Sequence, residues 1–280
     1  MKALTQSVLA AAMLMALPFA SAEACNKNAW LGNAAAASGV LASGTALPAG
    51  DPNKIPVYSG ECAIQASAGE FVTDNTPSAE ANFRARFYVF TSTSGKFFTA
   101  TAGEDSAGAE IVGASFNGSA ISFSGPTGVA TVTAPANRWC SVEVFHSSGA
   151  AFSASVQCAG AATATTVTGT SVTGTVGSAA IGFIGTGPGA MVLDDYNSTR
   201  SATTPIGRLC RGNAVNTDTI INIQDRISLN NQIIGQTTGT GVARGQPDMN
   251  EDGVVSIQDR IQVNGIISSG QGGTFCGGVN

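Results

Sequence analysis

The chain has 280 residues and a net charge of −5, with 11% charged and 43% hydrophobic residues. This composition argues against an intrinsically disordered chain, which combines low hydrophobicity with high net charge. It also argues against a coiled coil or helical bundle, which needs many Glu, Lys, Leu and Arg residues. The acidic balance makes nucleic acid and anionic membrane surfaces poor partners. What remains fits a turn-rich, mainly β, exported chain with room for about two domains.

Residues 1–24 are typical of a secretory signal peptide. Lys2 precedes the apolar run 8–17, and small residues follow Pro18, which is the order of a signal sequence with its cleavage site. The apolar run is too short to span a bilayer, which takes about 20 apolar residues. We therefore predict a secreted protein, extracellular or on the cell surface, with a periplasmic location left open and no membrane span.

The cysteines after this segment are Cys25, Cys62, Cys140, Cys158, Cys210 and Cys276. An even number in an exported chain predicts up to three disulfides. Residues 138–146 and 151–158 are typical of two strands joined by a turn, which would bring the third cysteine opposite the fourth. The last two bracket the C-terminal segment, which leaves the first two for each other. The other connectivities remain open.

Short alternating apolar runs separated by turns extend from residue 70 to residue 196. In 82–90 the apolar side chains would face a core, while Arg84 and Arg86 would face water. Similar runs lie at 110–116, 119–123, 129–133, 179–184 and 191–196. The Thr- and Val-rich stretch 161–175 favours strands as well. Together these runs predict an antiparallel β-sandwich or barrel.

Four segments follow one another in an order that is similar to bacterial laminin-G-like domains of the concanavalin A-like jelly-roll class. They are FRARFYV at 83–89, RWCSVEV at 138–144, FSASVQC at 152–158, and the stretch 180–208 with its aspartate pair Asp194-Asp195. The resemblance covers roughly residues 70–207. It implies two packed antiparallel sheets with a surface that binds ligands, often glycans. We expect this laminin-G-like sandwich to occupy residues 25–207.

Catalytic residues do not assemble into a recognisable set. The Glu-x-Asp-x-x-Glu spacing of concanavalin-like glycosidases is absent, and the histidine at position 146 is the only one. We expect His146 to be a hydrogen-bonded or solvent-facing imidazole, and Trp139 to be a core residue. The segment Gly185-Thr-Gly-Pro-Gly189 is interpreted as a turn between strands and not as a phosphate loop, because Pro188 interrupts it and no helix follows.

The segment 248–259 fits an EF-hand-type calcium loop that ends in Asp in place of Glu. Calcium takes six to eight oxygen ligands, and Gly253 allows the sharp turn at the sixth position. The predicted ligands are Asp248, Asn250, Asp252, Val254 through its carbonyl, Ser256 and Asp259.

A second copy of this pattern lies upstream, because Ile-Gln-Asp-Arg-Ile occurs at 223–227 and again at 257–261. Ala214 stands at the first loop position and Thr219 at the turn position, so the upstream loop is degenerate. Asn213 would substitute for the first ligand if the backbone bulges by one residue. The set for this loop is Asn213, Asn216, Asp218, Ile220 through its carbonyl, Asn222 and Asp225. We predict one Ca²⁺ ion and leave the second open.

Two calcium-loop-plus-helix repeats resemble a type I dockerin domain over residues 208–276. The resemblance implies a small α-helical module at 208–280 that is clasped by Cys210 and Cys276 and docks onto a cohesin. In dockerins the tenth and eleventh loop positions help to select the partner, often with Ser and Thr. Here these positions are Ile223, Gln224, Ile257 and Gln258. The expected partner is a cohesin-like protein, or the sandwich of this same chain.

The sequence therefore predicts a mainly β protein: an antiparallel β-sandwich (jelly roll) followed by a small α-helical, dockerin-like calcium-binding domain. The expected function is secreted, non-catalytic binding, with the module docking a protein and the sandwich binding glycan or protein. Two alternatives remain: a polysaccharide-degrading glycoside hydrolase tethered by its dockerin, and a self-assembling surface or filament subunit.

Overall fold

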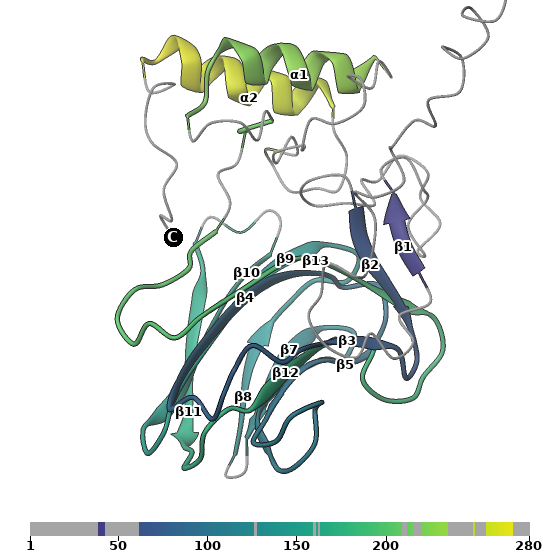
Figure 1. Ribbon diagram of the computed structural model, residues 1–280. Coiled ribbons are helices and arrows are strands. Elements are labelled where there is room, and N and C mark those ends of the chain that lie inside the picture. Colours follow the sequence, from purple (N-terminus) through teal and green to yellow (C-terminus); the bar gives the residue numbers. More distant parts are fainter. Residues whose placement is uncertain are drawn as a thin grey trace, which may run out of the picture.

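The computed structural model describes residues 62–125, 128–158, 163–208, 220–234 and 256–270, together with 39–42, 161, 212–214 and 249. The strands in this part of the chain form two sheets that lie face to face and curve in the same sense (Figure 1). Helices α1 (Ile223–Ile233) and α2 (Ile257–Ser268) lie outside the sandwich, on the side of the seven-stranded sheet (Figure 1).

The seven-stranded sheet is antiparallel at every pairing. Its strands, in spatial order, are β1 (Gly39–Ala42), β2 (Cys62–Ser67), β13 (Ala190–Thr199), β4 (Asn82–Phe90), β9 (Trp139–Ser147), β10 (Ala151–Cys158) and β11 (Thr165–Ser171). The last strand in the sequence, β13, thus lies between two early strands, β2 and β4.

The six-stranded sheet is antiparallel as well. Its order is β3 (Phe71–Asp74), β12 (Ser178–Gly182), β5 (Gly95–Thr101), β6 (Glu110–Phe116), β7 (Ala120–Gly125) and β8 (Gly128–Thr133). The two sheets confirm the predicted mainly β, antiparallel sandwich.

The core between the sheets follows from the alternation of side chains along each strand. On β4 the residues Phe83, Ala85, Phe87 and Val89 all point inward and are buried, as the sequence predicts. The Phe87 ring stacks on Phe98 of the opposite sheet, with centroids 5.0 Å apart. Aromatic contacts of this kind add to the free energy gained from burying apolar area.

The two arginines of β4 lie on the outer face of the seven-stranded sheet, yet the expectation that they face water is wrong. Their side chains are only 11% and 6% exposed. Arg84 Nη1 lies 2.7 Å from Glu143 Oε1 of β9, and Arg86 pairs with Asp195 of β13. A charged side chain can be buried when it is paired, and the partners here come from the neighbouring strands.

Glu143 also holds the chain after it leaves the sandwich. Its second carboxylate oxygen, Oε2, accepts a hydrogen bond from the backbone N–H of Gly207 at 2.9 Å. The stretch that leads toward the helices is thereby fixed to β9 on the outer face of the sheet.

The predicted hairpin of β9 and β10 is confirmed, and so is its disulfide. Cys140 and Cys158 stand directly opposite each other in the register and are bonded. Both are buried in the core between the sheets. The side chains of the other four cysteines lie outside the described residues.

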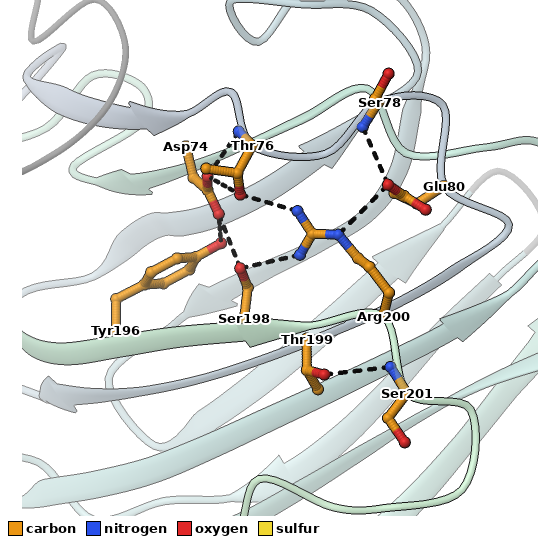
Figure 2. A network of polar contacts seen from close by, with 9 residues as sticks. All are labelled: Asp74, Thr76, Ser78, Glu80, Tyr196, Ser198, Thr199, Arg200 and Ser201. Carbon is orange, nitrogen blue, oxygen red and sulfur yellow. Dashed lines mark hydrogen bonds and ion pairs between the residues drawn. The ribbon is translucent and has the colours of Figure 1, made fainter.

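One buried carboxylate links the two sheets to each other (Figure 2). Asp74 ends β3 of the six-stranded sheet and is 6% exposed. Its Oδ2 accepts hydrogen bonds from the Tyr196 hydroxyl at 2.8 Å and the Ser198 hydroxyl at 3.0 Å, both on β13 of the other sheet. Its Oδ1 accepts from the N–H and the hydroxyl of Thr76 at 2.9 and 2.6 Å.

Arg200 closes this network from the end of β13 (Figure 2). It donates to the hydroxyls of Ser198 at 3.1 Å and Thr76 at 2.8 Å, and its Nε lies 3.6 Å from Glu80 Oε1. Burial, and then the nearby charge of Asp74, raise the pKa of Tyr196 well above its usual value. The phenol therefore stays protonated and acts as a donor to the carboxylate.

A β-bulge in β13 places these hydroxyls in the interior. The register moves from Asp194 opposite Tyr88 to Asn197 opposite Arg86, so one residue of β13 is extra. Asp195 has a φ of +46° at this point, a left-handed conformation that Asp tolerates better than most residues. Because the extra residue shifts the alternation by one, Tyr196 and Ser198 face Asp74 instead of the outer face.

We predict that the network responds unequally to two substitutions. Tyr196→Phe removes one of four bonds to Asp74 and should lower the free energy of unfolding by about 1 kcal/mol. Asp74→Ala leaves several buried donors without an acceptor and should cost about 3 kcal/mol. Urea unfolding followed by tryptophan fluorescence measures both values, with Thr131→Ala on exposed β8 as the control. Equal losses for the two variants would contradict this account.

Candidate functional site

The two helices pack on each other around a small apolar core. Ala214, Ile221, Leu229 and Val263 are buried there, and Leu229 and Val263 hold the same place in the two sequence repeats. None of the described helices is both long and apolar enough to span a membrane.

Asp259 fastens the predicted calcium loop to the start of α2. Its Oδ2 accepts hydrogen bonds from the N–H of Ser256 at 2.8 Å and from its hydroxyl at 3.2 Å, and the Ser256 hydroxyl accepts from Gln258 N–H at 3.1 Å. Its Oδ1 accepts from the N–H of Met249 at 2.8 Å. This is a capping box with a further bond to the other end of the loop.

Asp225 plays the same part at the start of α1. Its Oδ2 accepts from the N–H of Asn222 at 2.7 Å, and the Asn222 side chain in turn accepts from the N–H of Gln224 at 2.7 Å. Both aspartates are completely buried. The sequence repeat is therefore repeated in the geometry, with Asn222 in the place of Ser256.

Half of the predicted calcium ligands fall on described residues. The loop residues Asp248, Asn250, Asp252, Val254, Asn216 and Asp218 lie outside the part that the structure describes. Those inside it are Asn213, Ile220, Asn222, Asp225, Ser256 and Asp259. Within that part, no three His, Cys, Asp or Glu side chains gather as metal ligands. Calcium ligation therefore stays a prediction.

The predicted docking residues lie at the surface. Ile223 and Ile257 are 42% and 45% exposed, and one turn later Ile227 and Ile261 are 46% and 56% exposed. Gln224 and Gln258 are exposed beside them. The structure thus brings the equivalent residues of the two repeats to the surface of the paired helices.

The outer face of the six-stranded sheet carries a polar cluster that the sequence analysis did not single out. Glu110 of β6 accepts from Lys96 Nζ at 2.6 Å, Thr99 Oγ1 at 2.8 Å and Ser124 Oγ at 2.8 Å, which come from β5 and β7. The side chain lies over Gly113, where an added Cβ would stand 2.7 Å from Glu110 Oε1. Only glycine leaves room for this arrangement.

Glu110 is charged under ordinary conditions. Burial opposes its ionisation, but the hydrogen bonds from Lys96, Thr99 and Ser124, with the Lys96 charge, outweigh that effect. The pKa of Glu110 is therefore lowered. The residues of this Glu110 cluster come from three strands, so no local sequence motif marks them.

Three further predictions on the sandwich agree with the structure. His146 is buried, and its Nε2 lies 2.9 Å from the Gly174 carbonyl. Trp139 is buried against Phe90, with ring centroids 5.5 Å apart. The glycine-rich segment 185–189 forms the turn between β12 and β13.

Comparison with known proteins yields neither a matching family model nor a matching curated protein. Among solved structures, an α-L-arabinofuranosidase shares 10% identity over 52% of this chain and 40% of its own, with a TM-score of 0.39. The botulinum neurotoxin type G receptor-binding domain shares 10% identity, with coverages of 50% and 39% and a TM-score of 0.36. An alginate lyase shares 13% identity, with coverages of 50% and 80% and a TM-score of 0.35. The chain spans about two fifths of the length of the first two proteins.

We predict that Glu110 makes folding stability depend on pH. Because its pKa is lower in the folded protein than the unfolded value of about 4.3, its contribution is present above that pH. The contribution is lost as the pH falls through the folded pKa. Glu110→Gln should cost about 1 kcal/mol at neutral pH, and the difference from the unmodified protein should shrink toward pH 3. Urea unfolding at the two pH values tests this, and a constant difference would refute it.

Proposed function

We propose that this chain is a secreted binding protein in which a dockerin-like, calcium-stabilised module at residues 208–280 docks a protein partner. The observation that carries the proposal is the set of four isoleucines exposed at equivalent positions of α1 and α2. Single exposed apolar residues are common on protein surfaces. A matched set on two copies of one repeat is typical of a surface that contacts another molecule.

A docked partner would gain free energy by covering the exposed isoleucines. Burying an isoleucine side chain contributes about 1.5–3 kcal/mol relative to leaving it in water. Two such residues open each helix, and the exposed Gln224 and Gln258 stand beside them with donors and acceptors for specific hydrogen bonds. An apolar centre with polar neighbours is the usual composition of a protein interface.

Calcium is the cofactor that we propose for this module. A fully buried carboxylate is costly unless its charge is compensated, and Asp225 and Asp259 sit where each predicted loop ends. The donors in both loops are oxygen atoms, which suit a hard cation. Asp248, Asn250, Asp252, the Val254 carbonyl, Ser256 and Asp259 would hold the ion. Its charge would stabilise a module whose core is small.

Export is supported by the disulfide between Cys140 and Cys158, because such bonds persist in oxidising compartments. For the sandwich we propose glycan binding on the outer face of the six-stranded sheet. That face lies on the inside of the curve of the two sheets (Figure 1). The half-buried Ser124 and the exposed Thr131 add hydroxyl groups to the half-buried Lys96–Glu110 pair on this face, and such groups match the hydroxyls of a sugar.

We predict that calcium stabilises the helices and not the sandwich. Saturating calcium should raise the midpoint of the helical circular dichroism transition of the full chain, as expected for an ion that binds only the folded state. Tryptophan fluorescence comes from Trp30 and Trp139, which both precede the module in the chain, and its transition should have the same midpoint with calcium or EDTA. Asp259→Asn should remove the calcium effect and Gln262→Ala should keep it. A helical transition that ignores calcium would overturn the proposed cofactor.

We predict that docking depends on the isoleucines that open the two helices. The double variant Ile223→Asp, Ile257→Asp should lose calcium-dependent capture of a partner from the secreted proteins of the source organism by at least about tenfold. Ile234→Asp is the matched control, because Ile234 is 57% exposed at the far end of α1. Equal capture by the double variant and the control would exclude these residues as the docking surface.

A further inference from the structure

A groove of about 300 Å³ runs between the two helices. It is lined by Arg226, Ile227, Asn230, Asn231, Arg260 and Asn264. The lining thus combines two guanidinium groups with three carboxamides, and none of its described residues carries a carboxylate. This volume is at the lower end of ordinary ligand pockets, which suits a single side chain.

The lining follows the repeat of the sequence. Arg226 and Arg260 hold the same position in the two copies, and so do Asn230 and Asn264. Arg260 Nη1 donates to Asn230 Oδ1 at 2.9 Å, so one arginine is held across the groove by the other helix. A guanidinium has five N–H donors, which leaves others for a ligand.

The arginines of this groove differ from the paired arginines of the sandwich in their surroundings. Among the described residues, neither Arg226 nor Arg260 takes part in an ion pair. In the sandwich, by contrast, Arg84, Arg86 and Arg200 each lie within ion-pair distance of a carboxylate. Two guanidinium groups that have no ion-pair partner among the described residues would attract an anion, and the planar guanidinium fits a carboxylate through two parallel hydrogen bonds.

The neighbouring surface indicates which anion fits. Ile227 lines the groove itself and is 46% exposed, and Ile223 and Ile261 are exposed on the same two helices. A ligand that enters the groove therefore meets apolar side chains at its edge, which a polypeptide with mixed side chains can contact. The net charge of −5 on the whole chain repels long polyanions such as nucleic acid.

We propose that the groove between α1 and α2 receives the carboxylate of an Asp or Glu side chain of the docked protein. This inference rests on the proposed docking function and adds the charge of the partner to it. Arg226 and Arg260 would hold the carboxylate, and the asparagine amides would complete its hydrogen bonds. The isoleucines would contact the apolar residues beside it.

The test uses the full chain in calcium and a fluorescein-labelled peptide that alternates Ile and Glu, with fluorescence polarisation as the readout. The Glu peptide should bind saturably and about tenfold more tightly than the same peptide with Gln, as expected for a charge-assisted pair of hydrogen bonds. Arg226→Gln should weaken binding about tenfold. The Arg226 side chain makes no hydrogen bond or ion pair with the other described residues, so this change should leave the helical circular dichroism unaltered. Arg226→Lys keeps the charge but loses the planar pair of N–H donors, so its affinity for the Glu peptide should lie between those of the unmodified chain and Arg226→Gln.

Gln262→Glu is the matched control. It lowers the net charge of the same module by one, as Arg226→Gln does, at an exposed position of α2 outside the groove lining. Its affinity should stay within about twofold of the unmodified chain if contact in the groove, and not the long-range field, decides binding. An equal loss in both variants would overturn the proposal.

Other results would show that the groove binds a different ligand. If the Glu and Gln peptides bind alike, or if inorganic phosphate or an oligogalacturonate displaces the Glu peptide more strongly than unlabelled Glu peptide does, the protein carboxylate is the wrong ligand. The docking function fails separately, through the isoleucine variants. Capture that is lost in Ile223→Asp, Ile257→Asp but unchanged in Arg226→Gln would keep the docking function and reject the groove.

Discussion

The sandwich depends on a carboxylate that lies between its two sheets. Asp74 closes β3, the edge strand of one sheet, and is reached by hydroxyls of β13, a central strand of the other. A charge in this place is tolerable only because four donors surround it. The bulge at Asp195 is part of this network, because without the extra residue the side chains of Tyr196 and Ser198 would point away from Asp74. Apolar packing holds the sheets together, and this network fixes the edge strand β3 against β13 of the other sheet.

The helical part of the chain uses a related device on a smaller scale. Asp225 and Asp259 are buried carboxylates that accept backbone N–H groups at the start of each helix. With only 11% charged residues, the protein places a notable share of its carboxylates inside, where they organise backbone. The two arginines of the groove differ from these aspartates, because they lie at the surface and form no ion pair with another described residue.

Much of the architecture could be predicted from the sequence, because it is local. The alternation in 82–90 gives the strand and its buried face, and the spacing around the β9–β10 turn gives the Cys140–Cys158 bond. The burial of Arg86 could not be predicted, because its partner Asp195 is 109 residues away. The Glu110 cluster and the Asp74 network likewise join residues from separate strands. For the C-terminal repeats, the sequence pattern marked both aspartates as candidate ligands and gave the arginines no role, because only the packing of the helices puts the arginines into one groove.

The bond between Gly207 and Glu143 has a mechanical consequence. A partner that pulls on the helices transmits tension along the chain, and this tension reaches β9 through the Gly207 contact before it reaches β13. Beyond that contact the load falls on a strand hydrogen-bonded on both sides, to β2 and to β4. Gly207 has a φ of +77°, a left-handed conformation that glycine adopts at no steric cost, so a residue with a side chain at this position would strain the backbone that supplies the donor. The hydrogen bond from Gly207 to Glu143 thus attaches this stretch to β9 in addition to its covalent link to β13.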